Sequence, residues 1–289
     1  MTGQINWFDN RTDYERYVQQ DFDQRRMHEL EISKLKGWKG YCVYCHKHTE
    51  FKVSVGLYLG RNVHLREGLV CKKCGLCNRL RLLYKAVEDS CSGLPGLRHK
   101  KIYVAERLSN FYLRLAKRAP NLAGSEYLDP ALKSGEARLI GNANVIHQDL
   151  CNTSFQDNSF DLVVHTDILE HVAYYRKALS ESFRIIAPDG STIFTMPFLH
   201  DRYEHVIRAT LSANGVITHH HPAGYHGNPL DPAGSLVYQI FGWQLLDDLR
   251  AAGFRKALIG VLTDLQLGFT SSNSPGYEYM EPVVFIATR

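Results

Sequence analysis

From residue 99 onward, short apolar runs alternate with amphipathic segments. The apolar runs predict buried strands at residues 101–105, 122–127, 144–148, 160–165 and 191–196. Between such runs, residues 109–119 and 174–186 have helical character. Because strands that alternate with helices build a parallel sheet with right-handed crossovers, the pattern predicts an α/β fold.

The two ends of the chain follow other patterns. Residues 242–254 predict a helix that stops at Gly253, and the runs "KALIGVL" and "EPVVFIATR" predict two final strands joined by "SSNSPG". Near the start, residues 12–36 predict one amphipathic helix. Thr12 and Glu15 fit a capping box there, and Gly37 suits its end.

Between these parts lie two cysteine pairs with the same spacing. The pairs are about 25 residues apart and are joined by short β-like runs; their members are Cys42, Cys45, Cys71 and Cys74. Four thiolates at this spacing can surround one Zn²⁺ as a tetrahedron, so we predict a zinc ribbon whose metal supplies much of its folding free energy. The competing interpretation is four buried or free thiols. Alternative ligands are Cys77, His46 and His48.

Composition narrows the class of protein. The chain has 289 residues, of which 44% are hydrophobic and 22% charged, as in an ordinary globular protein. Its N-terminus has no apolar signal region, and no stretch approaches the roughly 18 to 20 apolar residues of a membrane-spanning helix. Seven clustered cysteines suit a reducing compartment and a metal site, so we expect a cytoplasmic protein.

A linker divides the chain into two predicted domains. The segment "SCSGLPGLRHK", residues 90–100, is rich in Gly, Pro and Ser. We therefore expect an N-terminal helix and zinc-ribbon module over residues 1–98, and an α/β domain over residues 99–289.

Two segments of the second domain resemble a known family. The text "NSFDLVVHTDILEHV" followed by "ALSESFRIIAPDGSTIFTMP" resembles the fourth strand, next helix and fifth strand of class I S-adenosylmethionine-dependent methyltransferases. The resemblance covers about residues 99–289. It implies a Rossmann-like sheet of seven strands, mostly parallel, with an antiparallel last strand.

The layout of the whole chain also resembles one bacterial subgroup of that family. The resemblance rests on the cysteine module, on Arg79 and Arg81 after it, and on a first strand that ends in Ala-x-Glu. Members of the subgroup are associated with sugar, cell-surface glycan or natural-product pathways. The resemblance therefore implies methyl transfer to a small-molecule, sugar or natural-product acceptor, most often at oxygen.

The resemblance also implies a cofactor site at successive strand ends. Glu126 would accept both ribose hydroxyls, because a carboxylate presents two acceptors to a vicinal diol. Asp149 would bind the adenine amino group, and Leu150 would add backbone and apolar contact. The remaining positions line the end of the fourth strand or lie near the adenine: Thr166, Asp167, Leu169 and His171. A helix cap at Asp149 and a surface charge at Glu126 are the competing interpretations.

The turn "VAERLSN" lacks the glycines that usually contact the cofactor. Ala105 is small, and Ser109 or Asn110 can cap the next helix, so backbone amides still face the crevice. Glu106 adds a negative charge that suits the cofactor's ammonium or sulfonium. We expect an altered cofactor turn; the alternative is a catalytically inactive scaffold that has lost the site.

The long segment 197–241 is the expected acceptor side, since connections of this length are usually functional. Histidine is the natural general base near neutral pH. His200 lies closest to the fifth-strand end, with His221 and His226 behind it. For each of these histidines, the competing interpretation is a role in a lid or in packing. A second metal held by these histidines with Asp201 or Glu204 is a further alternative.

A nucleic-acid-binding protein, or an RNA methyltransferase, is the alternative from another class. The cysteine module carries basic side chains at Arg61, Arg66, Lys72, Lys73, Arg79 and Arg81, and aromatic ones at Tyr41, Tyr44, Phe51 and Tyr58. The net charge of +4 does not by itself indicate nucleic acid.

Overall fold

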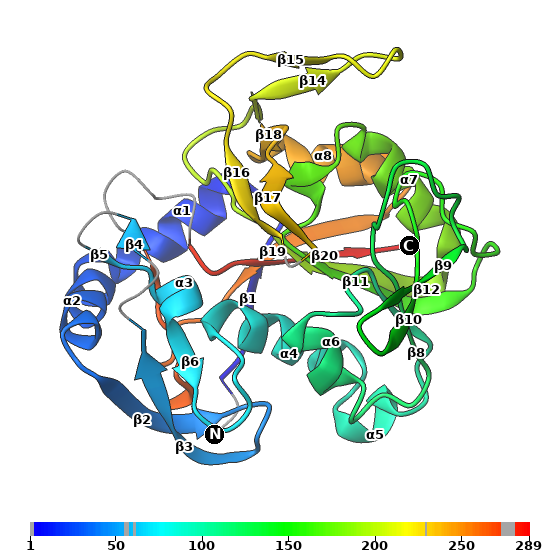
Figure 1. Ribbon diagram of the computed structural model, residues 1–289. Helices are drawn as coiled ribbons and strands as arrows, with labels where there is room; N and C mark the ends of the chain where they lie inside the picture. The colour runs from blue at the N-terminus through cyan, green and yellow to red at the C-terminus, as the bar shows by residue number, and fades with distance from the viewer. Residues whose placement is uncertain (1–2, 55–57, 60–61, 229, 273–280) are drawn as a thin grey trace.

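The computed structural model describes residues 3–54, 58–59, 62–228, 230–272 and 281–289. A seven-stranded sheet forms its centre (Figure 1). In spatial order the strands are β1 (Asn6–Phe8), β19 (Lys256–Val261), β20 (Val284–Thr288), β12 (Ile186–Thr195), β11 (Phe160–Thr166), β7 (Ile102–Val104) and β8 (Leu122–Gly124).

Most of the sheet is parallel. Strands β8, β7, β11 and β12 pair in parallel, whereas β20 pairs antiparallel with both β12 and β19. The predicted α/β sheet with an antiparallel last strand is therefore confirmed. Strand β1 adds an antiparallel edge beside β19, so the N-terminal segment contributes to the central sheet.

One predicted strand lies outside this sheet. Strand β10 (Ala143–Ile146) pairs antiparallel with β9 (Ala137–Ile140) in a separate hairpin. A single parallel bridge between Glu126 and His147 connects that segment to the continuation of β8. The hairpin exposes Leu139 and Ile146 to solvent, so it lacks the two buried faces of a central parallel strand.

Helices cover both faces of the sheet. They are α4 (Asn78–Ser90), α5 (Leu94–Leu97), α6 (Asn110–Leu115), α7 (Tyr175–Ile185) and α8 (Gln244–Ala251), with the 3-10 turns η1 (Leu169–His171) and η2 (Leu265–Leu267). Helix α6 begins where expected, because Ser109 Oγ accepts the Tyr112 amide at 3.0 Å. Because strand side chains alternate, Val104 and Val164 face the core beneath α4 and α6, whereas Tyr103 and Val163 face the core beneath α7 and α8.

The predicted single helix over residues 12–36 is wrong. Two helices occupy this region, α1 (Arg11–Gln20) and α2 (Phe22–Ser33). Asn10 rather than Thr12 caps the first, since its side chain accepts the Asp13 amide at 2.9 Å. Asp21 leaves helical geometry between the two helices, and Gly37 begins a strand rather than ending a helix.

The cysteine-containing region forms its own small antiparallel sheet. Its strands are β2 (Gly37–Cys42), β3 (Lys47–Val53) and β6 (Leu69–Cys71), followed by α4 after the short helix α3 (Leu65–Gly68). A further pair, β4 (Tyr58–Leu59) and β5 (Asn62–Val63), lies beyond β3. Phe51 and Leu76 of this region share one hydrophobic core with Val104 and Val164 of the central sheet. A domain boundary at residue 98 stays a prediction.

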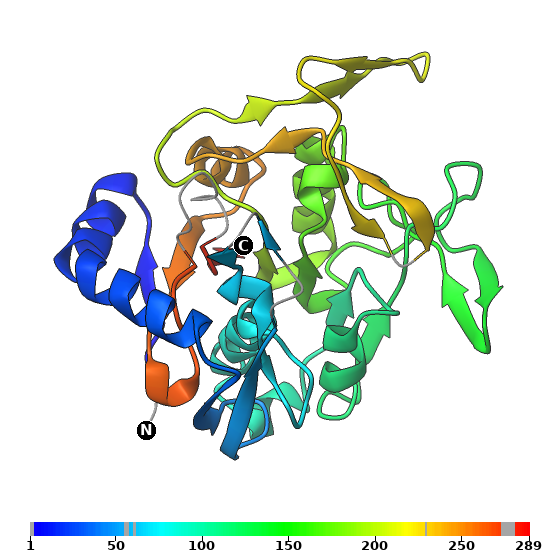
Figure 2. The ribbon, with the colours of Figure 1, turned by 60° about the vertical axis from the view of Figure 1, so that its left-hand side comes forward.

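The expected acceptor segment is built from short paired strands. They are β13 (Val206–Ile207), β14 (Ala209–Leu211), β15 (Ile217–His219), β16 (Tyr225–Asn228), β17 (Asp231–Leu236) and β18 (Gln239–Ile240). The β14–β15 hairpin projects from the body of the molecule in both views (Figures 1 and 2). Within the described ranges, the chain has no helix long and apolar enough to cross a membrane.

Candidate functional site

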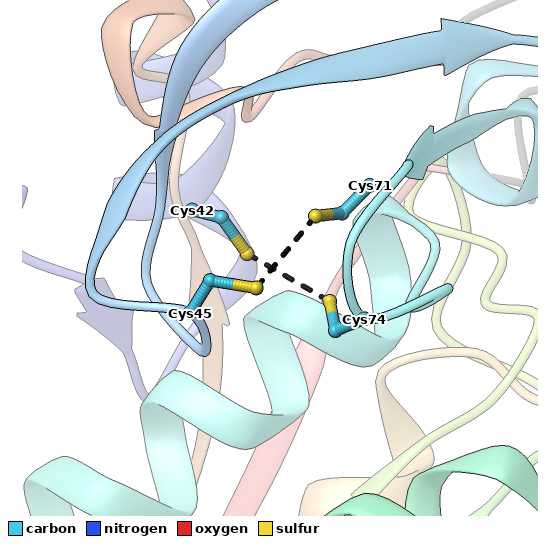
Figure 3. A group of neighbouring side chains, drawn as sticks. All are labelled: Cys42, Cys45, Cys71 and Cys74. Carbon is cyan, nitrogen blue, oxygen red and sulfur yellow. Dashed lines mark hydrogen bonds between the residues drawn. The ribbon is translucent and has the colours of Figure 1, made fainter.

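The four paired cysteines converge on one point (Figure 3). The Sγ atoms of Cys42 and Cys74 are 3.8 Å apart, and those of Cys45 and Cys71 are 3.9 Å apart. Zinc–sulfur bonds of about 2.3 Å in a tetrahedron require sulfur separations of about 3.8 Å. The arrangement therefore fits a Zn²⁺ ion. Cys77 is directed elsewhere, since its Sγ lies 3.2 Å from Glu67 Oε2.

Arg81 braces the cysteine-containing region from inside. Its side chain is fully buried and donates to the carbonyl oxygens of Leu69 and Leu76 at 2.8 and 2.9 Å, and to that of Gly268. The guanidinium carbon also lies 4.3 Å from the centre of the Phe51 ring. Arg81 is thus a structural residue, and neither a solvated helix position nor an anion-binding one.

Two arginines from this region reach the carboxyl end of β11. Arg66 donates to both Asp167 carboxylate oxygens at 2.8 Å, and Arg79 lies 3.4 Å from Oδ1 of the same residue. Thr195 Oγ1 also donates to Asp167 at 2.9 Å. Burial alone would raise the pKa of Asp167, but the two guanidinium groups outweigh burial and lower it. Asp167 is therefore an ionised carboxylate in a mostly buried ion network.

Glu67 completes this network on the other side of the arginines. It accepts from Arg79 Nε at 2.5 Å and from Arg66 Nη1 at 2.8 Å. Burial would raise the pKa of Glu67, whereas Arg79 and Arg66 together lower it to about 2. Two carboxylates thus balance two guanidinium groups, so the network presents little net charge to a ligand.

Glu106 connects the ends of β7 and β11. Its Oε2 accepts the Thr166 amide at 2.6 Å, and the Thr166 hydroxyl bonds to Oε1. Burial raises the pKa of Glu106 to about 8, although the bonds from Thr166 and the charge of Arg79 oppose the rise. Ala105 beside it is buried and belongs to the core under α7 and α8.

Glu126 and Asp149 lie on adjoining segments at this edge. Glu126 Oε1 accepts the Leu108 amide at 2.7 Å, which directs the carboxylate toward the altered turn. The Glu126 amide donates to the Ile146 carbonyl oxygen, and the Gln148 amide donates to the Glu126 carbonyl oxygen, both at 3.0 Å. This pairing brings the segment that contains Asp149 alongside. Asp149 Oδ1 accepts the Cys151 amide at 2.8 Å, and Leu150 is buried.

The structure places His226 beside a buried acid that the sequence reasoning missed. Glu170 is 1% exposed, and its Oε1 lies 3.6 Å from His226 Nδ1 and 3.8 Å from His171 Nε2. The two imidazole rings meet edge to face, with centres 4.9 Å apart. Glu170 could have been selected from the sequence because it directly precedes the candidate residue His171 in "LEHV".

The other two candidate histidines lie elsewhere. The His200 ring centre is 6.2 Å from that of Tyr14, and the His200 carbonyl accepts from Trp243 Nε1 at 2.9 Å. His221 is exposed, and its backbone amide donates to the Arg208 carbonyl oxygen. Asp201 and Glu204 are also exposed. Among the described residues, the grouping of histidines with a carboxylate at metal-binding separations therefore involves Glu170 rather than these acids.

Four of the eight described residues proposed for a basic and aromatic surface are buried, namely Arg66, Arg81, Tyr44 and Phe51. Arg66, Arg81 and Phe51 are 2% exposed or less. Of the basic residues proposed for nucleic acid, Lys72 and Lys73 are exposed, while Arg61 and the side chain of Tyr58 lie outside the described part of the chain. Arg66 and Arg79 pair with internal carboxylates, and Arg81 donates to backbone carbonyls, so these arginines offer little charge to a phosphate backbone.

Comparison with known proteins places part of this chain in a recognised sequence class. Residues 108–194 match the family model of a methyltransferase domain. This segment runs from the turn after β7 to the end of β12, and it contains Glu126, Asp149 and the β11–η1 region. The matched residues make up less than half of the chain.

Individual relatives match over shorter stretches. The chain is similar to demethylmenaquinone methyltransferases from Geobacillus kaustophilus, at 36% identity over 74 residues, and from Clavibacter sepedonicus, at 31% over 81 residues. These alignments cover 24% and 27% of this chain and 32% and 33% of the relatives. The chain thus spans about a third of the length of the curated relatives it matches.

Solved structures of methyltransferases are similar at a low level. An S-adenosylmethionine-dependent methyltransferase from Mesorhizobium loti has 16% identity and a TM-score of 0.42, covering 72% of this chain and 100% of the other. The 1,6-didemethyltoxoflavin N1-methyltransferase of Burkholderia thailandensis has 14% identity and a TM-score of 0.41, covering 73% and 78%.

Proposed function

We propose that the protein is an S-adenosylmethionine-dependent methyltransferase acting on an oxygen of a small-molecule, sugar or natural-product acceptor. One observation carries the proposal. Inside the segment that matches a methyltransferase domain, Glu126 and Asp149 follow successive strands, and backbone pairing brings their segments together. Ligands of open α/β sheets bind at this carboxyl edge.

The donor set at this edge suits the cofactor. Glu126 has one carboxylate oxygen bonded to Leu108, which fixes its direction, and a carboxylate can accept from two ribose hydroxyls. Asp149 would accept from the adenine amino group, with Leu150 and His171 near the ring. Ala105, Glu106, Thr166 and Asp167 would border the methionine end. Bound S-adenosylmethionine supplies an electrophilic methyl group, so the chain's task is to orient the acceptor and exclude water.

A structural zinc ion in the cysteine site is part of the proposal. Sulfur separations of 3.8 and 3.9 Å support it. None of the seven cysteines, all of which are described, forms a disulfide, in keeping with the cytoplasmic location expected from the sequence. The zinc would fix the turns after β2 and β6, and with them the arginines that meet Asp167.

Calorimetric titration of the zinc-loaded protein with S-adenosylhomocysteine and S-adenosylmethionine tests the proposal. We expect micromolar binding, weakened at least tenfold in Glu126→Gln and Asp149→Asn. Glu31→Gln, which alters an exposed residue of α2, is the control and should bind like the wild type. Absence of binding in the zinc-loaded wild type would favour the inactive scaffold instead.

A further inference from the structure

Glu170 is an unusually placed carboxylate. It is 1% exposed, and neither of its carboxylate oxygens has a hydrogen-bond partner among the described residues. Burying a carboxylate without a partner costs several kcal/mol, so such groups are normally paired or coordinate a metal. Ring nitrogens of His171 and His226 lie 3.8 and 3.6 Å from its Oε1.

The orientation of His171 suits a metal ligand. Its Nδ1 lies 2.8 Å from the Leu236 carbonyl oxygen. A carbonyl can only accept, so Nδ1 carries a proton, and in the neutral imidazole Nε2 is then the nitrogen that can bind a cation. A ring nitrogen that donates to a backbone carbonyl while the other faces a cation is the usual arrangement of metal-bound histidines.

The backbone around this group is well anchored. Tyr238 donates its amide to the Glu170 carbonyl at 2.8 Å, and Gln239 Nε2 donates to the carbonyls of Leu169 and Val172 at 2.6 and 3.1 Å. These bonds attach η1 to Tyr238, which follows β17, and to the first residue of β18. His226 lies on β16, which pairs with β17, so its ring is held in the same assembly.

We propose that Glu170, His171 and His226 bind a divalent transition-metal cation. One carboxylate oxygen and two imidazole nitrogens lie within 4.8 Å of one another. Metal–ligand bonds of about 2.1 Å place neighbouring ligands about 3.0–3.4 Å apart, slightly closer than the observed 3.6 and 3.8 Å. Two imidazoles with one carboxylate favour Zn²⁺, Mn²⁺, Co²⁺ or Fe²⁺ over Ca²⁺ and Mg²⁺, which prefer oxygen ligands.

Three protein ligands leave positions for water or for a substrate oxygen. The following consequence rests on the proposed methyl transfer. An acceptor hydroxyl that binds the cation loses its proton to solvent more readily, because the cation lowers its pKa. The oxygen then forms a bond to the methyl carbon while the carbon–sulfur bond breaks, and sulfur keeps that electron pair. This favours acceptors with two neighbouring oxygens that can chelate the ion, and His226 then acts as a ligand rather than as a base.

Titration with Mn²⁺ tests the site. Mn²⁺ binds thiolates weakly. In protein whose cysteine site already holds one zinc ion per chain, bound Mn²⁺ therefore reports on the site of Glu170, His171 and His226 alone. Electron paramagnetic resonance measures free Mn²⁺, and calorimetry gives the stoichiometry. We expect one Mn²⁺ per chain in the wild type. In Glu170→Gln and His226→Ala the affinity should fall at least tenfold.

His219→Ala, an exposed residue of the neighbouring hairpin, is the matched control and should bind Mn²⁺ like the wild type. Circular dichroism checks that each variant is folded. The His226 side chain is partly exposed, so His226→Ala tests the site even if Glu170→Gln unfolds. No Mn²⁺ bound by the wild type, or equal binding by the folded His226→Ala variant, overturns the site and leaves a Glu170–imidazolium ion pair. Parallel titration with S-adenosylhomocysteine separates this result from failure of the proposed function.

Discussion

Asp167 links the carboxyl end of β11 to the cysteine-containing region through Arg66 and Arg79. Its φ of +49° is uncommon for a residue other than glycine, and the network supports that conformation. The same side chain thus lies at the expected cofactor edge and in the contact between two parts of the fold. Its contribution to stability can be measured separately from ligand binding.

We expect Asp167→Asn to lower the free energy of unfolding by about 2–4 kcal/mol, because it leaves two mostly buried guanidinium groups with one carboxylate. Denaturant unfolding of the zinc-loaded protein measures this. The control is Asp189→Asn, which removes an exposed ion pair with Arg255 and should cost less than about 1 kcal/mol. Equal effects of the two substitutions would mean that the Asp167 network adds little stability.

Single residues differ in how far the sequence predicts their roles. The cysteine spacing indicated a common centre, and Ser109 was recognisable as a helix cap, because both depend on short-range pattern. The burial of Glu170 was not recognisable, since it depends on a hairpin far along the chain. The burial of Arg81 was not recognisable for a similar reason. Its carbonyl partners include Gly268, which folding brings beside α4.

At the scale of elements, the turn η2 packs directly against β2 and β3. Gly268 ends η2 with φ of +70°, and a Cβ there would lie 2.3 Å from Phe51 Cε2. Phe51 in turn stacks on Arg81. The close approach shows that the small cysteine-bearing sheet and the C-terminal part of the chain are fitted to each other.

We expect Gly268→Ala to destabilise the protein by about 3 kcal/mol, from backbone strain and displacement of Phe51. Gly215→Ala is the matched control. Gly215 has a similar φ of +78°, but a Cβ there meets nothing within 4 Å, so strain alone should cost about 1 kcal/mol. Thermal unfolding measures both, and similar melting temperatures for the two variants would contradict tight packing at Gly268.

The sequence predicted whether a segment forms a helix or a strand better than it predicted which strands pair with each other. The apolar runs identified β7, β11 and β12 because these strands are mostly buried, and they also identified β8, whose residues are partly buried. The run at 144–148 belongs to a hairpin, and β1 takes an edge of the sheet instead. Strand pairing depends on non-local contacts, so periodicity alone does not give it.

At the scale of the whole molecule, the cysteine-containing region and the central sheet share a hydrophobic core. Helix α4 follows the second cysteine pair directly and contacts β12 and β20. Loss of order at the cysteines should therefore spread to the sheet. The region is predicted to unfold together with the rest of the protein rather than independently.

Removing zinc should lower the melting temperature of the whole protein in a single transition, because metal binding contributes folding free energy. Cys74→Ser should have the same effect and release its zinc to a chromogenic chelator. Cys151→Ser, outside the cysteine centre, is the control and should retain one zinc per chain. An unchanged melting temperature after complete zinc loss would show that the metal has no structural role.

The central claim, a cofactor site at the carboxyl edge of β7, β8 and β11, is tested most directly by hydrogen exchange with and without S-adenosylhomocysteine. We predict slower exchange of backbone amides at residues 105–109, 125–128, 148–151 and 166–171, and little change in the β2–β3 hairpin. Protection confined to the cysteine-containing region, or no protection at saturating ligand, would contradict the account.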